Sequence, residues 1–360
     1  MVDIQFSPAI MGWKRSVVRG ASQATALVQR NVYIRLAVTI AFEVALIAIT
    51  FCSNFLSGYI FNHFFDFKAS RMAAMDNALR IIKAEKLFGM FIEQAVQKWN
   101  SDYIGGWSFW NTYYAGAHPV VTAGVLVILL VRMLYWQTFR SNWKKLRSSV
   151  DQTSPSPFRT EEERSPFHVQ NPAQQYYFLR SVWILGAWIA FLGFVFIPTM
   201  PPRLLPTCDY FNNTGLNVGG CIANDFTFVD TIGRFGSLLW DWEDPSVKTL
   251  NNPYAAFPSQ HSLFACWVAM VWICIWGPSS QTVTAFRRPA AFWLHFLGRW
   301  SIVLYPMLTI YCIVVTANHY IFDAFGGIAA LALSYVIVSW RTSKKKEGSP
   351  SSPHPEMLPV

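Results

Sequence analysis

The chain has 360 residues, of which 53% are hydrophobic and 14% are charged. Soluble domains carry about 25% charged residues, so this composition excludes an ordinary soluble protein. The formal net charge is +9, but the basic residues flank apolar runs and form no stripe with interleaved aromatic side chains. The sequence therefore gives no reason to expect a nucleic-acid partner.

The apolar residues gather in six runs, each of about the ~20 residues that a helix needs to cross a bilayer. These runs cover residues 33–57, 112–136, 178–199, 262–278, 298–318 and 323–341. The fourth is short and the last two nearly adjoin, so the number of spans is uncertain by about one. We expect an all-α polytopic membrane protein.

The basic residues indicate how the spans are oriented. They cluster in four segments, residues 14–30, 140–147, 287–299 and 341–346. By the positive-inside rule all four are cytoplasmic, which places both termini in the cytoplasm. Three segments then lie outside, at residues 58–111, 200–261 and 319–322.

We therefore expect one membrane-embedded domain at 33–341, with a cytoplasmic segment at 1–32 and a cytoplasmic tail at 342–360. The tail and a loop at 148–175 contain Ser-Pro pairs and no apolar periodicity, so both are predicted to be disordered. Between residues 68 and 99 apolar positions recur at a helical period, which predicts an amphipathic helix along the outer membrane face.

Two features of the outer and membrane segments remain open from sequence. Cys208 and Cys221 lie in the second outer segment, where a disulfide is plausible in an oxidising lumen, and Asn212 begins a glycosylation sequon. Glu43 lies within the first span, and ionisable residues there often serve a function. A protonated Glu43 bonded to a neighbouring helix is an equally good interpretation.

His319 and Asp323 form the first chemical motif. The spacing of four places both on one face of a helix, where the carboxylate fixes the imidazole tautomer and raises the basicity of its other nitrogen. That nitrogen is a candidate nucleophile toward phosphorus. A buried pair that only stabilises the start of a helix is the alternative.

Two further motifs lie at span ends on the same predicted side. Residues 258–261, Pro-Ser-Gln-His, open the fourth span, where helix N–H groups, Ser259 and Gln260 suit phosphate oxygens and His261 suits acid–base catalysis. Arg203, at the end of the third span, suits bidentate phosphate binding. The alternatives are an ordinary N-cap at Ser259 and an interfacial arginine.

These motifs resemble the type 2 phosphatidic acid phosphatase (PAP2) superfamily. The Pro-Pro-Arg at 201–203, the Phe-Pro-Ser-x-His at 257–261 and the Asn-His-Tyr-x-x-Asp at 318–323 are most similar to its branch of inositol phosphorylceramide synthases and inositolphosphotransferases. The similarity covers residues 85–335. It includes the segments 85–89 and 113–119.

The resemblance implies a PAP2-type bundle with these site roles. His319 is the nucleophile that forms a phosphohistidine, Asp323 orients it, and His261 is the acid and base. Arg203 and Ser259 are implied to hold the phosphate, and Gln260, Asn318 and His118 are further candidates for binding it.

The chain departs from the superfamily pattern at three places, with Phe196 for a lysine, Cys312 and Ile313 in the place of a Ser-Arg pair, and Gln260 for a glycine. With fewer cations the site suits a singly charged phosphodiester better than a dianionic monoester, although Lys248, Arg234 or His118 are candidates to restore charge. We therefore expect transfer of a phosphorylated head group. A lipid phosphate or polyprenyl diphosphate phosphatase is the alternative, and a non-catalytic lipid-binding protein is a second.

No metal or cofactor motif is present, and the expected partners are phospholipid or sphingolipid substrates in the bilayer. The predicted lumenal site, disulfide and sequon favour the Golgi or endoplasmic reticulum membrane.

Overall fold

The computed structural model describes residues 32–64, 66–150, 171–205, 228–239, 252–275, 296–298 and 300–347. Within these ranges the regular structure is helical, with one isolated bridge between Thr199 and Ala255. The chain divides into two compact units, Met1–Cys52 and Ser53–Val360, and each is described by itself. Cys208, Cys221, Asn212 and Lys248 lie outside the described residues.

Helix α2 covers Val32–Phe64, so its N-terminal part forms the described portion of the first unit. This part contains Glu43, whose side chain is buried.

The second unit is a bundle of apolar helices. They are α5 (Trp107–Val150), α6 (Pro172–Phe196), α10 (Gln260–Ile275), α13 (Leu304–Val315) and α14 (Ile321–Glu347). Helix α6 contacts both α5 and α14, and α10 contacts all four of the other helices. Because α10 is central, side chains such as Trp267 are fully buried, and the Trp267 indole donates to the carbonyl oxygen of Leu179 in α6 at 2.9 Å.

Among the described residues, five helices are long and apolar enough to cross a membrane. These candidate spans are Leu36–Ser53, Trp107–Thr138, Pro172–Phe196, Phe296–Val315 and Ile321–Lys344. The fourth predicted run, residues 262–278, corresponds to α10, which is apolar but has 16 residues. At 1.5 Å per residue it is about 24 Å long, shorter than a ~30 Å hydrocarbon core. The all-helical membrane architecture is confirmed, with one short helix at its centre.

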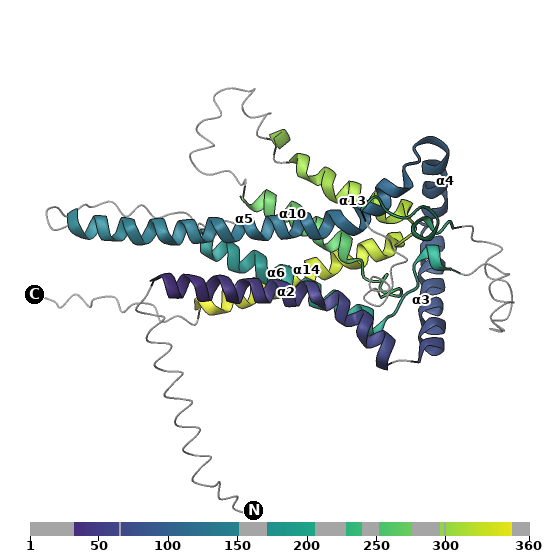
Figure 1. Cartoon of the computed structure of the whole chain (residues 1–360), viewed down its shortest axis with the longest axis horizontal. Helices are drawn as coiled ribbons and strands as arrows, with labels where there is room; N and C mark the ends of the chain where they lie inside the picture. The colour runs from purple at the N-terminus through teal and green to yellow at the C-terminus, as the bar shows by residue number, and fades with distance from the viewer. Residues whose placement is uncertain are drawn as a thin grey trace, which may run out of the picture. The chain divides into compact units, whose positions relative to one another are not determined.

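The predicted outer helix at 68–99 is two helices, α3 (Phe67–Leu87) and α4 (Glu93–Tyr103). The chain turns between them, and Gly89 there has a φ of 67°, a left-handed conformation that glycine adopts easily. Figure 1 shows α3 lying across the end of the bundle. The regular spacing of apolar residues concealed this break.

Helix α3 packs on the loops that precede the candidate site. Its residues Ala74, Ala78 and Ile82 form a buried cluster with Met200, Tyr254 and Tyr320. The Met200 amide donates to the Ala74 carbonyl oxygen at 3.0 Å. Because Met200 and Tyr320 are close in sequence to Arg203 and His319, α3 supports the two segments that carry these residues.

The two ranges predicted to be disordered have helical ends. Helix α5 continues to Val150, and α6 begins at Pro172, where the Asn171 side chain accepts a hydrogen bond from the Ala173 amide at 2.9 Å. Helix α14 continues to Glu347. Residues 151–170 and 348–360 lie outside the described residues.

Candidate active site

His319 lies in the turn between α13 and α14, not on a helix face. The turn is tied to the end of α13, because the amides of Asn318 and His319 both donate to the Ile313 carbonyl oxygen, at 3.0 and 3.1 Å. Ala317 adopts a φ of 54° to make this turn. The predicted geometry of two side chains on one helical face is therefore wrong for His319, which precedes the first residue of α14.

Asp323 reaches back from the first turn of α14 toward the histidine. Its Oδ2 accepts from the Tyr320 amide at 2.9 Å, as a helix-capping carboxylate does, and lies 3.5 Å from His319 Nδ1. Its backbone carbonyl oxygen accepts from the Ser259 amide at 2.9 Å. Asp323, with no exposed surface, therefore connects the His319 turn to the segment that carries His261.

His319 and His261 contact each other directly, with 3.3 Å between His319 Nε2 and His261 Nδ1. The two outer nitrogens face carbonyl oxygens, at 2.8 Å from His319 Nδ1 to Ala256 and at 3.1 Å from His261 Nε2 to Tyr114. A carbonyl oxygen only accepts, so each outer nitrogen carries a hydrogen. The two inner nitrogens then carry lone pairs, so a hydrogen bond between them requires one further proton.

Ser259 and Gln260 direct their polar groups into the protein. The Ser259 hydroxyl accepts from the Ser262 amide at 3.4 Å, a helix N-cap interaction. The Gln260 side chain donates to the Ala187 carbonyl oxygen of α6 at 3.4 Å. The structure thus gives both residues packing roles, and phosphate contacts by their side chains stay a prediction.

Arg203 lies in the short helix η1 (Pro202–Leu204), which is anchored to the histidine turn. Its Nε donates to Asn318 Oδ1 at 2.7 Å, and its backbone amide donates to the Ala317 carbonyl oxygen at 2.8 Å. Its guanidinium also forms an ion pair with Asp230 at 3.1 Å. Arg203, Asn318, Tyr114 and Ala256 line a small cavity of about 50 Å³. The cation and the amide therefore share this cavity with Tyr114 and Ala256, whose carbonyl oxygens contact the two histidines.

Two aromatic side chains of α5 hold the His261 ring. The Tyr114 ring stacks on it, with centroids 4.2 Å apart and planes 17° apart, and the His118 ring lies with its centroid 4.1 Å away. The Nδ1 atom of His118 is buried with no hydrogen-bond partner in the described part of the chain. Tyr114 was not singled out in the sequence, because an aromatic residue near a span end is usually part of the interfacial belt.

Glu85 of α3 and Glu93 of α4 were also missed. Both side chains are fully buried. Glu93 accepts from the Ile321 amide and Glu85 from the Phe322 amide, the two amides that come directly after the His319–Tyr320 pair. Burial and the neighbouring Glu93 raise the pKa of Glu85 to about 9. Charged residues in an amphipathic pattern normally mark the solvated face, so nothing in the sequence indicated that these two are buried.

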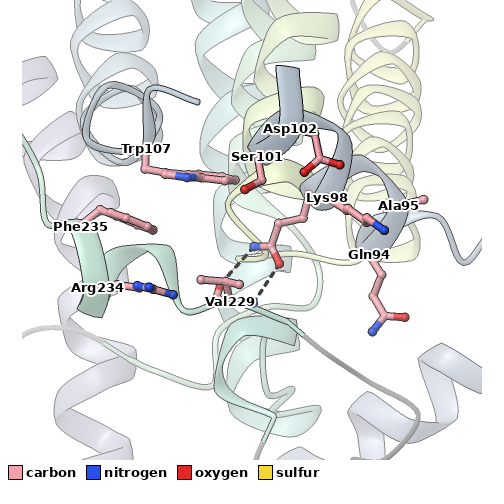
Figure 2. Close-up of a pocket in the computed structure, with 10 residues that line it drawn as sticks. Gln94, Ala95, Lys98, Ser101, Asp102, Trp107, Val229, Arg234 and Phe235 are labelled. Carbon is pink, nitrogen blue, oxygen red and sulfur yellow. Dashed lines mark hydrogen bonds between the residues drawn. The ribbon is translucent and has the colours of Figure 1, made fainter. Parts of the chain in front are cut away.

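A larger polar cavity of about 570 Å³ lies between α4 and α8 (Thr231–Phe235). Figure 2 shows Trp107, Phe235 and Arg234 on one side of it and Lys98 and Asp102 on the other. Arg234, one of the residues predicted to restore charge, lines this cavity and not the smaller one beside the histidines.

Comparisons with known proteins give one family. A model of the PAP2 superfamily matches residues 167–337, slightly less than half of the chain. Neither the curated proteins nor the solved structures include a match. The matched segment contains Arg203, His261, His319 and Asp323, the residues that the geometry brings together. The part of the chain that holds the histidine pair is thus similar to the PAP2 superfamily, whose members are generally phosphatases or phosphotransferases.

Proposed function

We propose that this protein is a membrane phosphotransferase that moves a phosphorylated head group between lipids through a phosphohistidine at His319. The reaction resembles that of an inositol phosphorylceramide synthase. The observation that carries the proposal is the contact of 3.3 Å between His319 Nε2 and His261 Nδ1, with Asp323 beside the opposite nitrogen of His319.

The first step uses the proton shared by the two histidines. When that proton is on His261 Nδ1, His319 Nε2 has a free lone pair and His319 Nδ1–H is held by Ala256 and Asp323. The phosphate of a donor phosphodiester lipid replaces the direct contact between the two histidine rings. His319 Nε2 then attacks its phosphorus. The bond from phosphorus to the departing lipid alcohol breaks, and that alcohol oxygen takes the proton from His261.

The second step returns the site to its starting state. His261 Nδ1, now without its proton, accepts the proton of an acceptor lipid hydroxyl. The oxygen of that hydroxyl forms a bond to phosphorus as the bond from phosphorus to His319 Nε2 breaks. Two alcohols have then exchanged at one phosphorus, and His261 has regained one proton.

The charge of the site supports a phosphodiester donor. Arg203 is held at the histidine cluster, and part of its charge is balanced by Asp230 at 3.1 Å. Cys312 and Ile313 stand in the place of a superfamily serine–arginine pair, and both are buried, with the Cys312 thiol directed at the Trp110 carbonyl oxygen. A phosphodiester carries one negative charge, whereas a phosphomonoester carries ~1.5 to 2 at pH 7. One partly neutralised guanidinium suits the diester better.

We place the reaction on the lumenal side of a Golgi or endoplasmic reticulum membrane. The side follows from the positive-inside rule applied to the basic segments, and the choice of membrane rests on the predicted disulfide and glycosylation sequon. Lipid phosphate hydrolysis, with water replacing the acceptor hydroxyl, is the second candidate, and the match to the PAP2 superfamily supports it as well.

An assay of the purified protein with labelled phosphatidylinositol and ceramide distinguishes head-group transfer from lipid phosphate hydrolysis. We expect the head-group label to move to ceramide with release of diacylglycerol, and His319→Ala to abolish this transfer. His63→Ala, which changes an exposed histidine of α2, is the matched control and keeps full activity. Release of free phosphate from phosphatidate, with no head-group exchange, would instead establish a phosphatase.

A non-catalytic lipid-binding protein predicts a different result. In that case His319→Ala retains its function in cells lacking the native chain, and neither assay shows turnover above the level of that variant.

A further inference from the structure

Three carboxyl groups from three helices bind three consecutive backbone amides at the start of α14. The Tyr320 amide donates to Asp323 Oδ2 at 2.9 Å, the Ile321 amide to Glu93 Oε1 at 2.9 Å, and the Phe322 amide to Glu85 Oε1 at 2.8 Å. These amides directly follow His319. A helix N-terminus with free N–H groups attracts negative charge, and here side chains of the same chain supply it.

Glu85 and Glu93 are unusual because both are fully buried and lie beside each other. Both Oε2 atoms lack a hydrogen-bond donor within the described residues. Two ionised carboxylates side by side in a buried site repel strongly, and one proton held between the two Oε2 atoms removes the repulsion and satisfies both oxygens.

The surroundings of the pair favour retention of that proton. Burial is the largest cause that raises the pKa of both groups, and Glu93 further raises that of Glu85 to about 9. Asp323 acts in the same direction on both, and the phenol of Tyr320, itself buried, also lies near these carboxyl groups.

We infer that Glu85 and Glu93 share one proton and act together as a positioning pair that holds the His319 turn in place for phosphoryl transfer. The positioning role rests on the proposed function, because neither residue touches the reacting atoms. Both lie outside residues 167–337, so the pair belongs to the part of the chain that the superfamily model does not match.

Glutamine substitutions test the shared proton directly. In Glu85→Gln the amide oxygen still accepts from the Phe322 amide, and the NH2 group donates to Glu93 Oε2 in place of the proton. In Glu93→Gln the amide oxygen likewise still accepts from the Ile321 amide, and the NH2 group donates to Glu85 Oε2. In the double variant two NH2 groups face each other with no acceptor between them, and rotating either amide turns its NH2 toward a backbone N–H.

We therefore expect each single glutamine variant to keep kcat and KM close to the native values. The double variant is expected to lose about a hundredfold in kcat with little change in KM, as for a misplaced catalytic group. Asp76→Asn, which changes an exposed carboxylate of α3, is the matched control and alters neither. If the fold loss of kcat in the double variant is no larger than the product of the losses in the two single variants, the inference is overturned.

The infrared C=O stretch of a protonated carboxylic acid gives a second readout that needs no turnover and no double variant. The native protein at neutral pH should show this band, and either single glutamine variant should lose it. Retention of the full band in both single variants also overturns the inference. If His319→Ala leaves lipid turnover intact, the proposed function fails, while the infrared band still decides whether the two glutamates share a proton.

Discussion

At the scale of single residues, the proposed mechanism depends on where one proton resides. The carbonyl oxygens of Ala256 and Tyr114 accept from the outer nitrogens of His319 and His261, so only a proton between the inner nitrogens is free to move. In the proposed first step that proton is on His261, where it leaves His319 Nε2 as the nucleophile and makes His261 the acid.

The His261 side chain should therefore matter for chemistry more than for lipid binding. We predict that His261→Asn lowers kcat by about 10²–10⁴-fold, the usual contribution of a general acid or base, with KM changed much less. Steady-state kinetics over a range of donor lipid concentrations measures both. A rise in KM at constant kcat would show instead that His261 only binds substrate.

The raised pKa of Glu85 predicts that the stability of the fold depends on pH. Its pKa is raised from 4.5 to about 9, so between these values the folded protein binds more protons than the unfolded chain does. Its contribution to stability is therefore complete below pH 4.5 and is lost as the pH rises to about 9. Thermal unfolding across this window should show a falling Tm for the native protein and a shallower fall for Glu85→Gln. Equal slopes in the two proteins would contradict the assignment.

At the scale of the helices, the site is set by close packing between α14 and the segment that begins α10. A Cβ atom at Gly327 would overlap the carbonyl oxygen of Ser259 and the hydroxyl of Ser262, and one at Gly326 would overlap the Phe257 ring. Only glycines allow α14 to lie this close, and the Ser259 amide can then reach the Asp323 carbonyl oxygen.

We predict that Gly327→Ala destabilises the fold by about 1–3 kcal/mol, the usual cost of overpacking, and lowers activity by displacing His261. Gly124→Ala in α5 is the matched control, because a Cβ there meets nothing within 4 Å. It should leave the Tm unchanged or raise it slightly, since alanine favours a helix interior. Equal unfolding temperatures for the two variants would refute this packing role.

The sequence predicted the elements better than their junctions. Long apolar runs identify spans because the thickness of the bilayer sets their length. The helix α10 is shorter than a span, and only the structure shows that it lies at the centre of the bundle. The break between α3 and α4 at Gly89 was missed, since one positive φ does not interrupt the spacing of apolar residues. His319 and Asp323 were paired correctly as neighbours, but through a capping turn and not through a helix face. Glu85 and Glu93 acquire their role from contacts over more than 200 positions of the chain, which no local pattern reveals.

At the scale of the whole molecule, the orientation in the membrane decides which compartment the site faces. The basic clusters predict both termini in the cytoplasm, which requires an even number of crossings. Among the described residues five helices meet the length of a span, so an even number requires a further crossing, and the short apolar helix α10 is our candidate for it.

Epitope tags at the two termini test this orientation in sealed vesicles. Both tags should be cleaved by protease added to the cytoplasmic side, without detergent. Protection of one tag alone would mean an odd number of crossings, and the site would then need a new assignment of its membrane face.

The central claim is that His319 carries the transferred group. The most direct test incubates the protein with a donor lipid labelled in its head-group phosphate, without acceptor, and locates the label by fragmentation mass spectrometry after an alkaline quench. We predict an acid-labile adduct on His319 that is lost on addition of the acceptor lipid and absent in His319→Ala. Turnover of the donor with no label on His319, or with label on another residue, would contradict the account.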